Sequence, residues 1–159
     1  MDIKPMKRVE LYADGACSGN PGRGGWAAIL VYRGHERQLT GSERETTNNR
    51  MELTGVISGL EALNMPCEVT VYTDSQYVVR AVNEGWAAKW RAAGWIKPDK
   101  KPAKNPELWE RLLELCGIHA VTFVWVKGHA ENEYNNRCDA LATETITRLK
   151  NMEKGIYPT

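Results

Sequence analysis

The order in which two hydrophobic periods follow one another along the chain is the feature that most constrains its fold. Apolar and polar residues alternate, as in half-buried strands, over about residues 8–14, 26–33 and 36–42. The period then becomes helical over about residues 51–63, and a strand pattern returns at 67–73. This order predicts an antiparallel three-strand meander followed by strand–helix crossovers, and therefore an α/β fold with a mixed sheet and helices on both faces.

The second half of the chain completes this pattern with one more strand and several helices. Asn105, Pro106 and Glu107 supply the cap, the first-turn proline and the acidic first turn of a helix, and Gly117 is its expected end. The elements expected here are helices over 76–83, 86–93, 105–117 and 136–150, a loop over 94–104 and a fifth strand over 120–126.

Size and composition narrow the class of protein. A chain of 159 residues with 42% hydrophobic residues fits one domain, and it has no apolar run of the roughly 20 residues that a membrane helix needs. The first residues lack the apolar centre of a secretory signal peptide, so we expect a cytoplasmic protein. The four cysteines lie far apart and form no zinc motif; we expect them to be reduced and mostly buried.

Charge is distributed unevenly, although the net charge is only +1. Between Trp86 and Lys104, six cationic side chains face Asp99 alone, so this limb carries +5 and the remainder of the chain −4. Tryptophans are interleaved with the cations. A basic limb on a slightly acidic body is typical of a protein that contacts a polyanion on one side.

Four carboxylates occupy positions from which they can reach one place. Asp14 and Asp74 end two strands that can pair in parallel, while Glu52 and Asp139 fall in the expected first turns of two helices. Each has an ordinary alternative role, as a cap or as a complement to a helix dipole. A true cluster would need cations, and hard oxygen ligands favour Mg²⁺ or Mn²⁺; two such ions about 4 Å apart would suit displacement at phosphorus.

Four motifs make the prediction specific. The segments YADGACSGNPGRGGWA, TTNNRMEL, VYTDSQYV and WVKGHAENEYNNRCDALA occur in this order, and together they resemble type 1 ribonuclease H of the bacterial kind from about Arg8 to Lys150. The resemblance implies the ribonuclease H-like fold, with a five-stranded mixed sheet. It also implies an N-terminal extension (1–7), a catalytic domain (8–150) that includes a basic protrusion (86–104), and a C-terminal tail (151–159).

The resemblance also implies a reaction and its catalytic groups. Asp14, Glu52, Asp74 and Asp139 match the metal-binding carboxylates of the family, and His129 matches its mobile catalytic histidine. The implied activity is endonucleolytic hydrolysis of the RNA strand of an RNA/DNA hybrid with two Mg²⁺ ions, for which Mn²⁺ can substitute. The products would carry 5′-phosphate and 3′-hydroxyl ends.

Further positions match substrate contacts of the family. Amides suit the minor groove of a hybrid because they can donate to and accept from 2′-hydroxyls and base edges, although capping is their ordinary alternative role. We expect Trp86 to contact the DNA strand, and Trp90 to belong to the core. The matching residues are Cys17, Asn20, Thr47, Asn48, Asn49, Gln76, Trp86, Lys89, Lys100, Lys101 and Trp109. We expect a monomer; single-stranded DNA-binding protein is an open candidate partner.

Three alternatives stay open at this stage. One is another member of the same nuclease superfamily, such as the domain attached to reverse transcriptases or a strand-transfer enzyme. A second is a hybrid-binding module without catalysis, which four carboxylates facing a polyanion disfavour. A third is a nucleotide-binding protein that uses the glycine-rich turn after Asp14, but this turn lacks the Lys-Ser/Thr of a P-loop.

Overall fold

The computed structural model describes residues 6–127 and 132–155, and these form a five-stranded mixed sheet in the order β3-β2-β1-β4-β5. This confirms the expected α/β class and the strand count. In chain order the elements are β1 (Lys7–Gly19), β2 (Gly22–Tyr32), β3 (His35–Thr46), α1 (Asn48–Glu61), β4 (Cys67–Thr73), α2 (Gln76–Asn83), α3 (Trp86–Ala92), α4 (Pro106–Ile118), β5 (Ala120–Trp125) and α5 (Glu133–Glu153).

The strand pairing matches the predicted topology. β1 pairs antiparallel with β2, and β2 pairs antiparallel with β3, which gives the meander. β1 then pairs in parallel with β4, and β4 in parallel with β5. The pairing of β1 with β4 ends at Tyr12 and Tyr72, although β1 itself continues to Gly19. The carboxyl end of β4 therefore lies beside the middle of β1, next to Asp14, at one edge of the sheet.

Several expected element boundaries differ from the structure, and two of these differences bear on the site. β1 does not end at Asp14: its glycine-rich continuation stays paired with β2 as far as Gly19 opposite Gly22, because small residues can form a ladder although they read as a turn. The last helix begins at Glu133 rather than at 136, since the Asn132 side chain caps it, and it runs on to Glu153. The expected tail therefore starts inside a helix.

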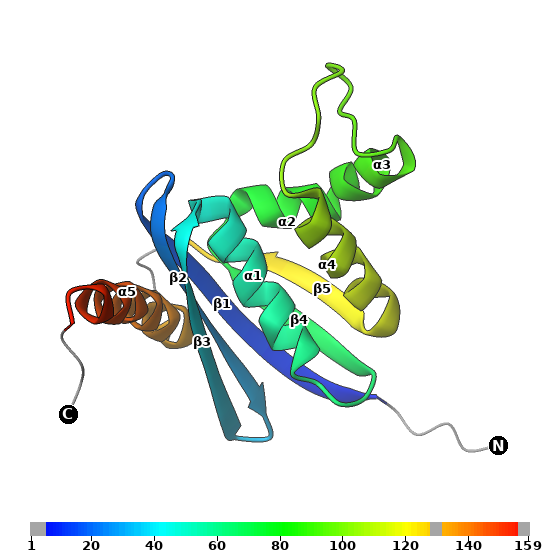
Figure 1. Cartoon of the computed structure of the whole chain (residues 1–159). Coiled ribbons are helices and arrows are strands. Elements are labelled where there is room, and N and C mark those ends of the chain that lie inside the picture. The colour runs from blue at the N-terminus through cyan, green and yellow to red at the C-terminus, as the bar shows by residue number, and fades with distance from the viewer. Residues whose placement is uncertain (1–5, 128–131, 156–159) are drawn as a thin grey trace.

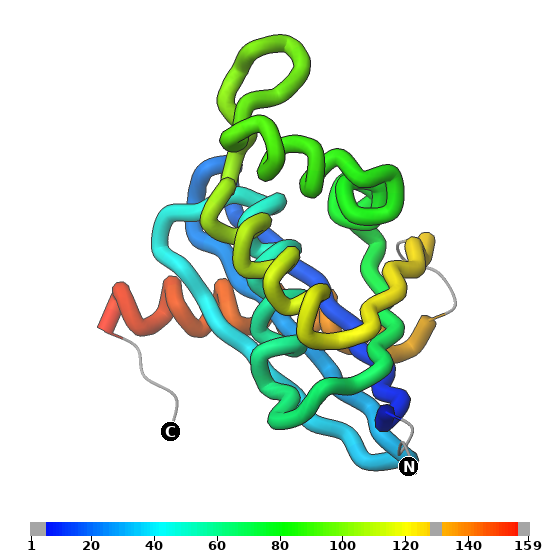
Figure 2. The backbone as a smooth tube through the Cα atoms, turned by 90° about the vertical axis from the view of Figure 1, so that its right-hand side faces the viewer, coloured from blue at the N-terminus to red at the C-terminus, as the bar shows by residue number. Residues whose placement is uncertain are grey.

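Helices cover both faces of the sheet (Figures 1 and 2). α1 packs against β1 and β2 on one face together with α4, and α5 packs against β1 and β2 on the other. The larger core lies on the α1 side and includes Leu11, Val56 and Val71, whereas a smaller core surrounds Tyr12 on the α5 side. The sheet is thus the middle layer of three.

The basic protrusion, residues 86–104, stands out from this body (Figures 1 and 2). At its base, Trp90 is 8% exposed and packs edge-on against Trp109, with ring centroids 5.9 Å apart. The core assignment of Trp90 is confirmed. The substrate contact expected of Trp109 is wrong: this side chain is fully buried, on the same helix face as Leu112 and Leu115.

Two further expectations concern the chain as a whole. Within the described residues, no helix is both long and apolar enough to cross a membrane. The cysteines are free thiols: Cys67 and Cys138 are buried, while Cys17 and Cys116 are half-buried.

Candidate active site

Three of the four predicted carboxylates meet at the edge where β1 and β4 lie side by side. Asp14 lies on β1, Asp74 directly follows β4, and Glu52 projects from α1. Each offers an oxygen within 4.8 Å of the oxygens of the other two. The structure therefore forms the cluster that the strand order predicts.

The approach of α1 to β1 depends on the absence of a side chain at Gly15. A Cβ atom added at this residue would lie 2.4 Å from the backbone nitrogen of Glu52 and 2.4 Å from the carbonyl carbon of Met51. Glu52 is the fifth residue of α1 and not part of its first turn, because the helix begins at Asn48 with Thr47 as its cap. The glutamate thus reaches Asp14 because the two backbones are almost in contact.

Burial dominates the electrostatics of the cluster. Asp14 is 6% exposed and Glu52 is 4% exposed. Burial, followed by the charge of Asp74, raises the pKa of Asp14 to about 7, although the Gly15 N–H donates to its Oδ1 (2.9 Å). Burial and the charges of Asp14 and Asp74 hold the pKa of Glu52 well above its usual range. Burial and the neighbouring carboxylates therefore make ionisation of Asp14 and of Glu52 unfavourable in the folded protein.

The donor set fits a hard divalent cation. All three side chains offer oxygen, and Glu52 Oε2 is buried without a hydrogen-bond partner in the part of the chain that the structure describes. A buried oxygen without a partner costs free energy unless a ligand binds it. Mg²⁺ and Mn²⁺ prefer oxygen ligands of this kind.

Asp139 lies close to the cluster but is not one of the three residues that share it. It is exposed in the second turn of α5, not in the first, because α5 begins earlier than predicted. Its charge still contributes to the raised pKa of Asp14. Two neighbours attach this part of α5 to the sheet: Cys138 Sγ donates to the Tyr12 carbonyl oxygen (3.4 Å) and Asn135 Nδ2 to the Tyr72 carbonyl oxygen (3.2 Å). His129 lies outside the described residues.

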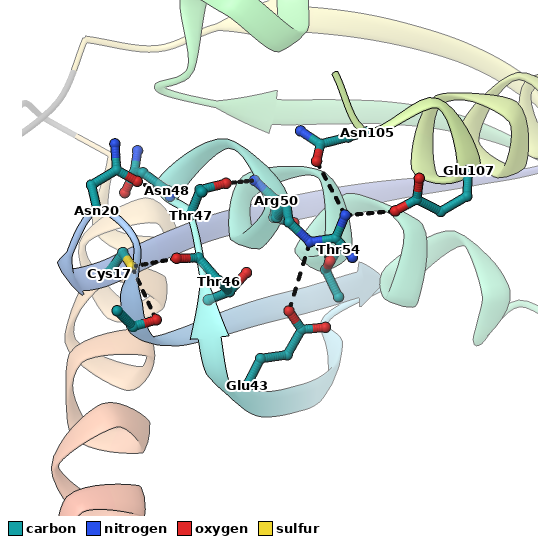
Figure 3. A network of polar contacts seen from close by, with 11 residues as sticks. Cys17, Asn20, Glu43, Thr46, Thr47, Asn48, Arg50, Thr54, Asn105 and Glu107 are labelled. Carbon is teal, nitrogen blue, oxygen red and sulfur yellow. Dashed lines mark hydrogen bonds and ion pairs between the residues drawn. The ribbon is translucent and has the colours of Figure 1, made fainter. Parts of the chain in front are cut away.

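The tip of the β1–β2 hairpin and the start of α1 bring several predicted substrate residues together (Figure 3). Cys17 Sγ donates to the Thr46 carbonyl oxygen (3.3 Å), and the Asn48 N–H donates to Asn20 Oδ1 (3.2 Å). Thr47 caps α1 by accepting from the Arg50 N–H (3.3 Å). Asn20 and Asn48 are exposed, so polar groups are presented to solvent near the carboxylates.

The other predicted contacts lie further along the same edge. Asn49 is exposed in the first turn of α1, and Gln76 is exposed as the first residue of α2. Trp86 begins α3 and is half-buried, with the Arg80 guanidinium 4.9 Å from its ring centroid. Lys89, Lys100 and Lys101 are exposed on the protrusion.

One group near the site was missed in the sequence. Arg50 joins α1 to Asn105 and Glu107, which lie 55 and 57 residues away along the chain. The hydrophobic periodicity of a sequence predicts helices and strands, but it does not predict a polar contact between residues so far apart in the chain. The available cue was the arginine inside the TTNNRMEL motif.

Comparison with known proteins identifies the family. Residues 6–147 match the family model described as RNase H. A ribonuclease H of Thermoanaerobacter sp. (strain X514) is 58% identical over 140 residues, which cover 88% of this chain and 90% of that one. A ribonuclease H of Syntrophus aciditrophicus (strain SB) is 56% identical over 154 residues, which cover 97% of this chain and 89% of that one.

Solved structures agree with the sequence comparison. LC9-RNase H1, described as a type 1 RNase H with the type 2 active-site motif, has a TM-score of 0.80 and 31% identity, covering 92% of this chain and 75% of its own. LC11-RNase H1, solved in complex with an RNA/DNA hybrid, has a TM-score of 0.66 and 25% identity, covering 89% of this chain and 99% of its own. The chain, whose motifs, fold and carboxylate cluster all agree with these matches, belongs to the ribonuclease H family of enzymes.

Proposed function

We propose that this protein is an endonuclease that hydrolyses the RNA strand of RNA/DNA hybrids. The observation that carries the proposal is the cluster of Asp14, Glu52 and Asp74 at the sheet edge, next to the exposed amides of the hairpin and α1. Family membership supports the activity, and LC11-RNase H1, a structural relative, was solved with such a hybrid.

The four carboxylates Asp14, Glu52, Asp74 and Asp139 would hold two Mg²⁺ ions, with Mn²⁺ as a substitute. When bound, such ions supply an activated water and stabilise the leaving oxygen, which gives 5′-phosphate and 3′-hydroxyl ends. The short distances among the oxygens of Asp14, Glu52 and Asp74, and the buried Glu52 Oε2 without a partner in the described part of the chain, support this assignment.

The remaining predicted residues would bind and orient the hybrid. Cys17 and the amides of Asn20, Asn48, Asn49 and Gln76 would face its minor groove, where they can distinguish 2′-hydroxyls. The protrusion, through Trp86, Lys89, Lys100 and Lys101, would bind the DNA strand together with Thr47. His129 would transfer a proton as the product leaves.

We extend the proposal to the state of the protein in the cell. A catalytic domain over 8–150 that acts as a monomer is supported by the fact that one chain supplies the carboxylate cluster and the neighbouring amides. Free cysteines suit the reducing cytoplasm. Single-stranded DNA-binding protein is a candidate partner, which co-sedimentation with the purified protein would test.

The test is cleavage of an end-labelled RNA/DNA hybrid, compared with RNA duplex, DNA duplex and single strands, in Mg²⁺ or in chelator. We expect cutting of the RNA strand of the hybrid alone, and only with metal. Asp14→Asn should lower the rate at least about 100-fold while hybrid binding is retained, because it removes a carboxylate from the cluster. Glu144→Gln, which alters an exposed carboxylate paired with Arg148 on α5, is the matched control.

Two outcomes would contradict the proposal. Full activity of the Asp14→Asn protein would remove the cluster from the reaction. Tight hybrid binding without cutting by the wild type, in Mg²⁺ and in Mn²⁺, would favour a binding module instead.

A further inference from the structure

The Arg50 guanidinium connects three elements (Figure 3). Nη1 donates to Asn105 Oδ1 (3.1 Å) and to Glu107 Oε1 (2.5 Å), and Nε lies 3.9 Å from Glu43 Oε2. The side chain is 30% exposed, so it lies against the protein rather than extending into solvent. One side chain from the first turn of α1 thus joins β3 to the start of α4.

Asn105 lies where the protrusion ends and the body of the protein resumes. Its backbone is in the left-handed region (φ 58°), which a non-glycine residue adopts at a cost unless its surroundings support it. Its carbonyl oxygen accepts from the Leu108 and Trp109 N–H groups, and its side chain accepts from Arg50. The direction in which the chain leaves the protrusion therefore depends in part on Arg50.

The protrusion has a second, apolar attachment on its other side. Trp90 of α3 packs edge-on against Trp109 of α4 in the core. Beyond α3, the Ala103 N–H donates to the Trp95 carbonyl oxygen (2.8 Å), and Ile96 pairs with Pro102, which closes the loop that carries Lys100 and Lys101. The start of the protrusion is held by packing, and its end is held by polar contacts.

The partners of Arg50 lie beside the polar groups that face solvent near the carboxylates. Thr47 caps α1 on the Arg50 N–H itself, and Asn48 binds Asn20 of the hairpin. A displacement of Asn105 relative to α1 would change the spacing between these groups and the lysines of the loop. Guanidinium suits this position because its planar fork can serve several acceptors at fixed angles, which an ammonium cannot do.

We infer that Arg50 is a positioning residue for substrate: it fixes the end of the basic protrusion against the start of α1, so that the cations and the groove-facing amides are correctly spaced before a hybrid binds. The inference rests on the proposed function for its substrate. Its physical basis is preorganisation, since a spacing set in the free protein need not be paid for during binding.

Arg50→Ala is the test, and Arg111→Ala is its matched control. Arg111, on α4, also joins this helix to α1, through Glu61 (3.4 Å), and it pairs with Glu114 (3.2 Å) within α4; Glu61 is the last residue of α1, at the end of that helix away from Arg50. Both substitutions remove a partly exposed arginine whose ion pairs lie at the surface, so neither should unfold the protein.

Hydrogen exchange of the free protein gives the first readout, and it does not depend on any activity. In Arg50→Ala we expect faster exchange of the Lys97 and Ala103 amides, whose hydrogen bonds close the loop, and unchanged exchange in Arg111→Ala. Equal exchange in the two variants would overturn the inference, whatever the protein cleaves.

Hydrolysis of the hybrid gives the second readout. Arg50→Ala should raise KM roughly 10-fold with kcat within about twofold, because binding loses preorganisation while the carboxylates stay in place. Arg50→Lys should recover part of the loss, and Arg111→Ala should match the wild type. A fall in kcat with unchanged KM would overturn the inference. Failure of the wild type to cleave would instead contradict the proposed function, and hybrid affinity of the two variants would then replace KM.

Discussion

At the scale of single residues, the burial of Asp14 and Glu52 lowers the stability of the folded protein. Two acidic side chains are almost excluded from water beside a third carboxylate. Burial and mutual repulsion make ionisation unfavourable for both, so the folded protein holds protons that an unfolded chain would release. Such a cluster is costly until a cation binds it.

The raised pKa of Asp14 predicts how stability depends on pH in chelator. An unfolded Asp releases its proton near 3.8, whereas the folded one does so at about 7, so this group makes folding less favourable as pH rises between these values. At pH 7.5, Asp14→Asn should therefore be more stable than the wild type by about 2 kcal/mol, or roughly 4–8 °C in Tm. At pH 4 the two should differ little. Differential scanning calorimetry at both pH values would measure this, and an equal difference at pH 4 and 7.5 would refute it.

His119 predicts an effect of the opposite sign. It is buried between α4 and β5, directly before Ala120, and its Nδ1 accepts from the Cys67 N–H (3.0 Å). Burial lowers the pKa of His119 in the folded protein below the ordinary value of 6.5. The neutral imidazole therefore contributes its full stabilisation above pH 6.5, and this stabilisation is lost as the pH falls through the lower pKa of the folded state.

We expect the wild type to lose about 1 kcal/mol relative to His119→Asn between pH 7.5 and 5.5. The substitution keeps an acceptor near Nδ1 but cannot gain a proton. Urea unfolding at the two pH values would measure the difference. His35→Asn, at an exposed histidine, is the control: an equal change in its pH dependence would show that burial of His119 is not the cause.

At the scale of elements, the site depends on how closely α1 and β1 approach each other. The contact is between backbones at Gly15 and therefore cannot be relieved by a change of rotamer. A side chain there would push the start of α1 away from the sheet and separate Glu52 from Asp14.

Gly15→Ala should accordingly destabilise the protein by about 3 kcal/mol. We also expect Mg²⁺ to raise the Tm of the wild type, as the proposed metal site requires, and not that of the variant. Gly117→Ala is the control, because a Cβ atom at that helical position meets nothing within 4 Å. It should be neutral or up to about 1 kcal/mol stabilising. Thermal melts with and without Mg²⁺ distinguish the two; a Gly15→Ala protein with the wild-type response to Mg²⁺ would show that α1 can move without consequence.

At the scale of the whole molecule, the basic protrusion lies toward the same end of the sheet as the start of α1 and the tip of the β1–β2 hairpin (Figure 1). The remainder of the chain is slightly acidic. The positive limb can attract a polyanion that the body alone would repel. The protrusion would thus attract the polyanion, while the carboxylate cluster lies on another part of the molecule.

Replacing both Lys100 and Lys101 by Ala should weaken hybrid binding roughly 10-fold at low salt and make the dependence of log Kd on log salt shallower by about one to two units. The reason is that fewer counterions are released on binding. Lys154→Ala, at the end of α5, is the control and should leave the slope unchanged. Fluorescence anisotropy over a salt series would measure both, and equal slopes for the two proteins would exclude phosphate contacts by the loop.

The confirmed predictions are those that local patterns encode. In β1, for example, the apolar residues Val9, Leu11 and Ala13 alternate with other residues because one face of the strand packs against α1. Patterns of this kind mark each helix and strand within its own segment, so the order of the elements could be predicted from the sequence. Strand order, together with the preference for short crossovers, then brought Asp14 next to Asp74. Trp109 could have been assigned to the core by the same periodicity, since Trp109, Leu112 and Leu115 share one helix face; the neighbouring cations suggested a surface instead.

The sequence by itself determined the order of elements and the family, because these depend on patterns and motifs whose residues lie near one another in the chain. Only the tertiary structure decided that β1 stays paired to Gly19, that Asp14 and Glu52 are buried together, and that Arg50 holds Asn105. These features depend on contacts between residues that are distant in sequence. Their energies come from burial and packing, which no local pattern records.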